Sequence, residues 1–329
     1  MPLELAPLAL AAVMLVFALS AAGSAPAQAP SSAKASADKP NAGDTSKVAP
    51  ARRPDREIVF KKTPQAELKL YAYLPPRWKA TDRRPAIVYF FGGGWNTGTP
   101  EQFLSKAEYF ASRGMVAFCA DYRVWSKHQT RIDAAVEDAR SAMRFVRKHA
   151  AEWGADPDRL VSAGGSAGAH LAAAVALLDG PDAADDDLAV SCRPQVMVLF
   201  NPVLDLNEPQ AVRFVRGNSP EETKQIIARL SPALFLKKGC PAAVLFYGTA
   251  DTFAAHGREF AKRSLALGNR VEFWTAAGQP HGFFNLSPWH EATVIRADEF
   301  LASLGYLAGA ATMKPAEGKA TLRKEMPAP

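Results

Sequence analysis

Residues 159–174, RLVSAGGSAGAHLAAA, place one serine between small residues at the joint of two expected elements. The stretch begins as an apolar run typical of a buried strand, crosses Gly164 and Gly165, and reaches Ser166 before an alanine-rich run typical of a helix. The pattern Gly-x-Ser-x-Gly at such a joint is typical of a sharp turn that points the serine hydroxyl away from the sheet. The stretch therefore predicts an α/β fold in which Ser166 is a nucleophile.

The sequence on both sides of this turn alternates between expected strands and expected helices. Such an alternation predicts an α/β fold with a mainly parallel twisted sheet and helices on both faces. Two alternating segments near the start predict an N-terminal antiparallel hairpin. The hairpin spans 57–62 and 67–75; the buried strands are expected in 85–95, 115–123, 159–165, 194–203, 242–251 and 270–278, and the helices in 100–114, 130–154, 166–180, 256–268 and 291–305.

The chain of 329 residues is expected to contain one folded domain between less regular ends. We expect a signal peptide over 1–29, because a short apolar run is followed by small residues and by Ala27-Gln28-Ala29, although the start carries Glu4 and no Lys or Arg. The run is short for a membrane span, so a periplasmic or secreted protein is expected, with an uncleaved anchor or a misplaced start codon as the alternatives. The remaining segments are a disordered linker (30–54), the catalytic domain (55–307) and a disordered tail (308–329).

Charge and cysteine content exclude several other functions. Of the formal net charge of +6, only +2 belongs to residues 55–305, so the folded part lacks the dense basic surface that nucleic-acid binding requires. The three cysteines have no metal-ligand spacing, and we expect no metal site. A bridge between Cys192 and Cys240 stays open for an exported protein, with free thiols as the simpler expectation.

His281 and Asp251 are the expected partners of the serine. A serine hydroxyl is a poor nucleophile at neutral pH and needs a base within hydrogen-bond reach. His281 is the histidine that follows a late strand, in the loop QPHGFFN, whereas His170 lies on the helix after the serine and His290 is expected in a loop. Asp251 ends the strand before, where a carboxylate can orient the imidazole, and the order Ser166, Asp251, His281 fits this architecture.

A triple glycine after the first long buried strand, FGGGW at 91–95, is the fourth feature at this edge of the sheet. Consecutive glycines let backbone N–H groups face a ligand without side chains in the way. Together with the N–H of Ala167, these groups predict an oxyanion hole, while a merely flexible loop is the alternative.

The sequence resembles the α/β-hydrolase superfamily, and within it the esterase branch related to hormone-sensitive lipase and to bacterial acetylxylan and feruloyl esterases. The resemblance rests on FFGGGW, ADYRV, DARSAMRFVRKHA, DPDRLVSAGGSAGAHLAA, GTADTF and QPHGFFN, spread over about residues 80–285. It implies the α/β-hydrolase fold, with Gly93, Gly94 and Ala167 as oxyanion donors and no cofactor. It also implies that Asp121-Tyr122-Arg123 supports the loops around the site.

The chain departs from that branch in two places. Phe91 stands where the branch has a histidine before the glycines, which puts the rigidity of this loop in question. Residues 30–54 do not resemble an N-terminal cap, whereas residues 204–236 are placed to cover part of the site. An open pocket suits an acyl group carried on a bulky alcohol.

These features predict a serine carboxylic-ester hydrolase for short acyl esters, with acetyl or feruloyl groups on plant or algal polysaccharide as candidate substrates. An amidohydrolase of the formamidase or peptidase kind is the alternative, because it uses the same three residues. A non-catalytic binding protein on the same fold is the third hypothesis, since fold does not imply function.

Overall fold

A sheet of nine strands forms the centre of the structure, a computed structural model that describes residues 48, 51–318 and 320–325. The strand order is β1-β2-β4-β3-β5-β6-β7-β8-β9, parallel from β4 to β8 and antiparallel at β1–β2, β2–β4 and β8–β9. The strands are β1 Arg56–Lys62, β2 Glu67–Tyr73, β3 Arg84–Phe90, β4 Val116–Ala120, β5 Ala155–Gly165, β6 Val196–Phe200, β7 Ala242–Gly248, β8 Val271–Ala276 and β9 Leu322–Glu325. The predicted α/β-hydrolase fold and its N-terminal hairpin are confirmed.

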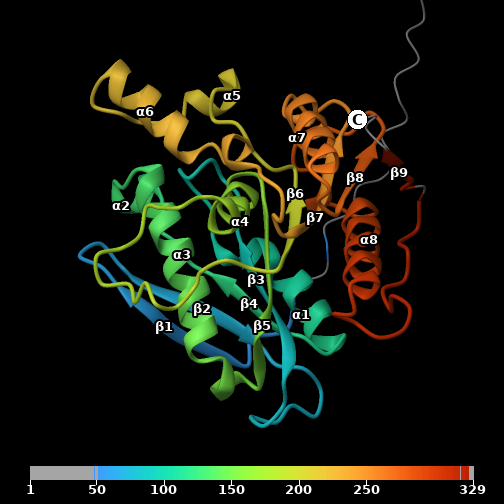
Figure 1. Cartoon of the computed structure of the whole chain (residues 1–329). Coiled ribbons are helices and arrows are strands. Elements are labelled where there is room, and N and C mark those ends of the chain that lie inside the picture. The colour runs from blue at the N-terminus through green and yellow to red at the C-terminus, as the bar shows by residue number, and fades with distance from the viewer. Residues whose placement is uncertain (1–47, 49–50, 319, 326–329) are drawn as a thin grey trace, which may run out of the picture. The chain divides into compact units, whose positions relative to one another are not determined.

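Helices cover both faces of the sheet (Figure 1). The α-helices are α1 Leu104–Ser112, α2 Trp125–His128, α3 Ile132–Lys148, α4 Ala167–Leu177, α5 Pro209–Val212, α6 Pro220–Leu230, α7 Ala254–Ala266 and α8 Trp289–Ser303; short 3₁₀ turns are η1 Pro100–Phe103, η2 Ala150–Trp153, η3 Pro232–Phe235 and η4 Phe283–Asn285. The pair α1 and α8 lies together on one face, where Arg113 Nε meets Asp298 Oδ2 at 2.6 Å. The crossovers through α3, α4 and α7 run in the opposite direction from the crossover through α1, and right-handed connections place them on the other face.

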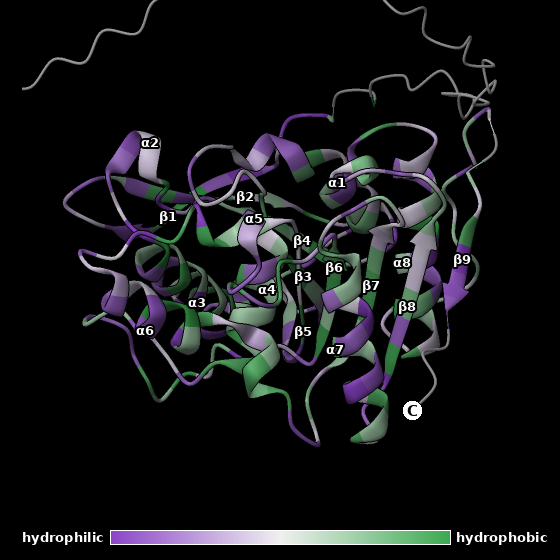
Figure 2. Ribbon diagram, turned by 90° about the horizontal axis from the view of Figure 1, so that it is seen from above, coloured by the Kyte–Doolittle hydropathy of each residue, from purple (hydrophilic) through white to green (hydrophobic). Residues whose placement is uncertain are grey.

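The central strands are buried on both faces, which explains their continuous apolar sequences. All five residues of β4 and of β6 are buried, and Figure 2 shows hydrophobic residues along the middle strands. The helix α4 is buried at every position, and its alanines allow it to pack closely against the sheet and against α3. The carboxyl ends of β5, β6, β7 and β8 therefore lie on a rigid base, and the site residues follow directly after them.

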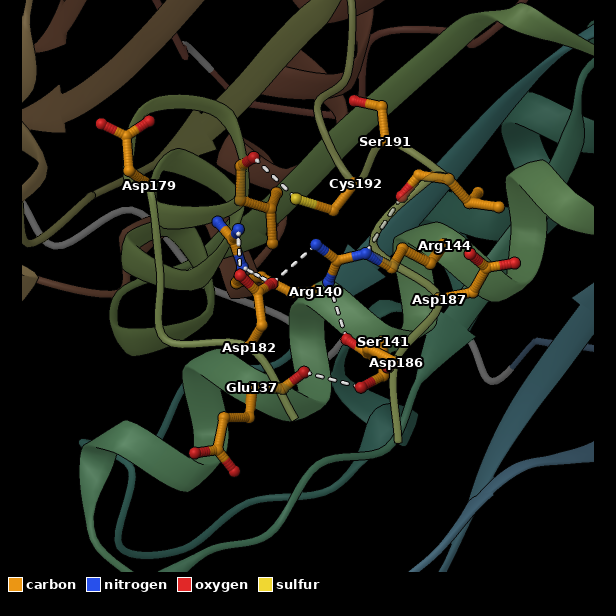
Figure 3. A network of polar contacts seen from close by, with 12 residues as sticks. Glu137, Arg140, Ser141, Arg144, Asp179, Asp182, Asp186, Asp187, Ser191 and Cys192 are labelled. Atoms are coloured by element: carbon orange, nitrogen blue, oxygen red, sulfur yellow. Dashed lines mark hydrogen bonds and ion pairs between the residues drawn. The ribbon is translucent and has the colours of Figure 1, made fainter. Parts of the chain in front are cut away.

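Arginines of α3 anchor the long connection between α4 and β6 (Figure 3). Asp182 Oδ1 lies 2.6 Å both from Arg140 Nε and from Arg144 Nη2, and Arg144 Nη1 meets Asp186 at 2.7 Å. Cys192 lies in the same connection, with its thiol near the carbonyl of Val175. The cysteines at 119, 192 and 240 are all free, so the bridge left open by the sequence does not form.

The segments at the two ends differ in part from the sequence prediction. Residues 322–325 were expected in a disordered tail, but they form β9, paired with β8 from Ala276↔Leu322 to Phe273↔Glu325. Residues 51–54 were expected in the linker, yet Arg52 contacts Asp55 at 2.8 Å and its carbonyl accepts from the Tyr73 hydroxyl. Both corrections have one cause: contacts with distant residues order segments that have no hydrophobic period of their own.

The predicted signal peptide and most of the predicted linker lie outside the described residues. All described residues belong to one compact unit within 40–329. Within the described part of the chain, every helix is too short or too polar to cross a membrane.

Candidate active site

The turn between β5 and α4 holds Ser166 in a strained backbone conformation. Its φ of 54° and ψ of −119° fall outside the regions that residues with a side chain normally adopt. Close packing fixes this turn, because a Cβ on Gly168 would lie 2.0 Å from the Phe90 carbonyl oxygen, and one on Gly165 would lie 2.4 Å from the Phe284 ring. The small neighbours of the serine are therefore required by the packing of strand, helix and loop.

His281 and Asp251 lie in line with this serine. His281 Nε2 is 2.7 Å from Ser166 Oγ, and His281 Nδ1 is 2.9 Å from Asp251 Oδ2. Asp251 is buried, and the imidazole side chain is 34% exposed. With the Nδ1 proton directed to the carboxylate, Nε2 is the free base that faces the hydroxyl. The structure thus brings together the three residues that the sequence singled out.

Asn201 is a further member of this cluster that the sequence analysis did not identify. Its side-chain amide donates to Asp251 Oδ2, the oxygen that also faces His281. It is fully buried directly after β6 and has a φ of 46°, unusual for a residue with a side chain. The other carboxylate oxygen accepts from the Phe253 N–H at 3.0 Å. The signal in the sequence was a polar residue at the carboxyl end of a central strand.

The glycine loop adopts a backbone conformation that favours glycine and leaves two N–H groups without acceptors among the described residues. Gly93 and Gly94 have φ values of +124° and +64°, and a Cβ on Gly93 would lie 2.2 Å from the Thr97 carbonyl oxygen. Among the described residues, neither glycine N–H has a hydrogen-bond acceptor. Ala167 begins α4, where a backbone N–H has no partner within the helix. Gly93, Gly94 and Ala167 all line the cavity that contains Ser166.

An aromatic pair braces the start of this loop, where the related branch has a histidine. The Phe91 ring stacks on Tyr122 with centroids 4.0 Å apart, and the Tyr122 hydroxyl donates to the Phe91 carbonyl at 2.7 Å. Burial raises the pKa of Tyr122 well above its usual range, so the hydroxyl stays a donor. Arg123 binds Asp138 instead, at 2.8 Å from Nε. The expectation that residues 121–123 support the loops is thus met through Tyr122.

Gln102 and Asn285 link the glycine loop to the loop that carries His281. Gln102 accepts from the Gly92 N–H through Oε1 and donates from Nε2 to Asn285 Oδ1 at 3.2 Å. Asn285 in turn donates to the Gly282 carbonyl at 3.0 Å. The two loops are therefore joined by side-chain amides, which sequence spacing alone could not reveal because the pair is 183 residues apart.

Lys106 holds the far side of the His281 loop. Its Nζ is 3.1 Å from the Phe284 carbonyl and 2.8 Å from His290 Nδ1, and it forms no ion pair with any described residue. Burial among aromatic rings lowers the pKa of Lys106 to about 7. His290, expected in a loop, lies in the first turn of α8, and burial and Lys106 together lower its pKa strongly. His290 is therefore a neutral acceptor.

His170, a second buried histidine, lies on α4 and does not face Ser166. His170 Nε2 is 2.8 Å from the Leu230 carbonyl, and burial lowers its pKa to about 4. It therefore stays neutral near pH 7 and ties α4 to the end of α6. This agrees with its exclusion as a base.

The cluster opens into a cavity of about 590 Å³. Aromatic and small residues form most of its walls, and Gln210, Ala211 and Phe214 come from the segment 204–236 that was expected to cover the site. Figure 1 shows α5 and α6 on the side of the sheet where β6 ends. A base, a hydroxyl and free N–H groups around an apolar cavity are the parts needed for acyl transfer.

Comparison with known proteins places the chain in a family. Residues 70–259 match the model of the BD-FAE family. The chain is 28% identical over 239 residues to carboxylesterase NlhH of Mycobacterium tuberculosis, a match covering 67% of this chain and 72% of that protein. It is 37% identical over 118 residues to the "Probable isoprenylcysteine alpha-carbonyl methylesterase ICMEL1" of Arabidopsis thaliana, a match covering 36% of this chain and only 24% of that protein.

Among solved structures, the chain is similar to the thermophilic esterase Est2 of Thermogutta terrifontis. With propionate bound, Est2 superposes with a TM-score of 0.72 at 42% identity, over 77% of this chain and 96% of Est2; a butyrate-bound form gives 0.71 and 41%, over 77% and 95%. The fold and the site thus define an α/β-hydrolase of the esterase class. Because the family model matches more than half of its residues, the chain belongs to the BD-FAE family.

Proposed function

We propose that the protein is a serine ester hydrolase for short acyl groups, acting through Ser166, His281 and Asp251. The observation that carries this proposal is the line of two contacts, 2.7 Å and 2.9 Å, from the serine through the imidazole to the carboxylate. His281 takes the serine proton as Oγ attacks the ester carbonyl, and Asp251 stabilises the imidazolium. Every group that this mechanism uses belongs to the chain, so it needs no cofactor and no metal.

The second half of the proposal concerns the developing oxyanion. The N–H groups of Gly93, Gly94 and Ala167 bind it, because they line the cavity beside the serine and lack partners among the described residues. His281 then gives its proton to the departing alcohol, and water activated by the same imidazole releases the acid. The N-terminal end of α4, which carries a partial positive charge, begins directly after Ser166 and also stabilises the negative charge of the oxyanion.

Short acyl groups fit this proposal best. Est2 has been solved with propionate and with butyrate bound, and its likeness to this chain extends over nearly its whole length. Acetyl or feruloyl esters on plant or algal polysaccharide are the proposed natural substrates. The partly exposed imidazole supports them, because a site open to solvent accepts a bulky alcohol.

The test is the substitution Ser166→Ala, assayed with 4-nitrophenyl esters from C2 to C12. We expect the variant to lose about 10³-fold or more in kcat with its circular dichroism unchanged, since its nucleophile is gone. Ser303→Ala, at the end of α8, is the matched control and keeps the wild-type rate. Activity peaking at C2–C4 supports short acyl groups, whereas wild-type rates in Ser166→Ala would reject the mechanism.

The competing hypotheses give different results in the same preparation. An amidohydrolase hydrolyses formamides or anilides faster than the matching esters. A non-catalytic binding protein does not react with a fluorophosphonate probe at Ser166.

We also propose export to the periplasm or medium through residues 1–29 and no nucleic-acid partner; N-terminal sequencing of the mature protein tests the export.

A further inference from the structure

Arg213 brings a positive charge without a described counter-ion to the wall of the cavity. The residue follows α5, is exposed, and lines the cavity together with Phe214. Its guanidinium lies over the Phe214 ring, 4.9 Å from the centroid. Among the described residues, its side chain forms no hydrogen bond and no ion pair. An arginine stays charged at every working pH and presents its donors in a planar fork, so this group is available to an anion.

Phe214 fixes the place of this charge against the glycine loop. A Cβ on Gly94 would lie 3.1 Å from Phe214 Cε1, so the ring rests directly on the glycine whose N–H we assign to the oxyanion hole. Phe214 therefore contacts both Gly94 and Arg213, and all three residues line the cavity that contains Ser166.

The neighbouring arginines are engaged elsewhere. Arg216 stacks on Trp125 at 4.4 Å and reaches Asn96 Oδ1 at 3.4 Å, and Arg131 pairs with Glu222 at 2.6 Å. The described residues that line the cavity include no acidic side chain. The described lining of the cavity therefore carries the positive charge of Arg213 and no negative charge, since the Asp251 carboxylate lies behind His281 and not among the lining residues.

We propose that Arg213 recognises an anionic group of the substrate, and that the preferred esters carry a carboxylate on either the acyl group or the alcohol. A carboxylate can accept two N–H groups from one guanidinium, which adds orientation to attraction. The inference rests on the proposed ester hydrolysis. Because Arg213 is exposed, added salt should weaken the preference.

Two matched pairs of aryl esters test the proposal and show whether Arg213 recognises a carboxylate on the leaving alcohol or on the acyl group. Comparing 4-acetoxybenzoate with 4-acetoxybenzamide changes the charge on the leaving alcohol. Comparing phenyl 4-carboxybenzoate with phenyl 4-carbamoylbenzoate changes it on the acyl group. For each pair, the ratio of kcat/KM between the charged and the neutral ester is measured in the wild type and in Arg213→Gln, Arg213→Lys and Arg213→Glu. Comparing this ratio between the wild type and the variants cancels the difference in intrinsic reactivity of the two esters.

We expect the ratio of at least one pair to fall roughly 5-fold in Arg213→Gln and further in Arg213→Glu, while Arg213→Lys keeps part of it. In 0.5 M NaCl the wild-type ratio should move toward that of Arg213→Gln. Equal losses for charged and neutral esters would mean that Arg213 only packs on Phe214, and would overturn the proposal while leaving ester hydrolysis intact. No turnover of any ester by the wild type would overturn both.

Discussion

The turn that carries Ser166 and the loop that carries His281 are held in place by different means. The turn follows from its own sequence, because the strand, the small residues and the helix are adjacent in the chain. The loop that begins at His281 has only the short turn η4 before α8. It is held by Gln102 and Lys106, which precede it in the sequence by 183 and 178 residues counted to their partners Asn285 and Phe284. The shape of the nucleophile turn is therefore set by its own residues, with Phe90 and Phe284 packed against it, whereas the base is positioned by side chains from distant segments.

The largest contrast between the turn and the loop is expected when one glycine in each is replaced by alanine and the loss of unfolding free energy is compared. In Gly168→Ala the new Cβ would lie 2.0 Å from the Phe90 carbonyl oxygen, which cannot move without shifting β3. We expect the free energy of unfolding to fall by about 3 kcal/mol or more. In Gly282→Ala the nearest atom lies 3.7 Å away, and only the φ of +84° costs energy, about 1 kcal/mol. Urea unfolding of both variants measures this; equal losses would contradict the contrast.

How much the sequence could predict follows the same division. Ser166, Asp251 and His281 were identifiable because each follows a strand whose end meets the others at one edge of the sheet. Asn201, Gln102 and similar supporting residues were missed, since their partners lie on distant segments and no spacing rule connects them. The strand β9 was missed for the same reason: its four residues alternate weakly and become ordered by pairing with β8.

Asn201 offers the next test, because it holds Asp251, the carboxylate that orients His281. Asn201→Ala removes a donor from Asp251 Oδ2 and leaves the carboxylate free to turn away from His281. We expect kcat to fall roughly 30-fold with KM little changed, since the substrate does not touch this residue. Asn201→Asp should fall further, because it places a second carboxylate against the first. A rise in KM with unchanged kcat would mean that Asn201 shapes the cavity instead.

Lys106, which contacts the loop that carries His281, should make the free energy of unfolding depend on pH. Its pKa is lowered by burial to about 7, whereas a lysine in the unfolded chain titrates near 10.5. Between these values the unfolded state binds more protons, so the contribution of Lys106 to stability rises with pH from about 7 to 10 and is lost as pH falls toward 7. From pH 7 to 9 we expect a gain of about 2 kcal/mol in the wild type that is absent in Lys106→Met.

Parallel stability curves for the two proteins would show that Lys106 is not buried as a free base. Activity supplies a second readout. Lys106→Met leaves the Phe284 carbonyl and His290 Nδ1 without their donor, so the loop that carries His281 becomes less ordered. We expect a lower kcat with retained fluorophosphonate labelling of Ser166, because the turn is built without Lys106. Loss of both would mean that the turn and the loop form one unit.

The smallest effect is expected at β9, which lies outside both regions. Glu325 meets Arg258 at 2.9 Å and accepts from the Thr275 hydroxyl at 2.9 Å, so Glu325→Ala removes contacts that tie the strand to α7 and β8. Surface pairs of this kind contribute little, and we expect a loss of about 0.5 kcal/mol in unfolding free energy with unchanged kcat/KM. Arg323→Ala, on the same strand and exposed, is the matched control. A loss of activity in Glu325→Ala but not in Arg323→Ala would show that the order of β9 affects the position of Asp251 through β8 and β7. The tail would then belong with Gln102 and Lys106 among the distant segments that position the catalytic residues.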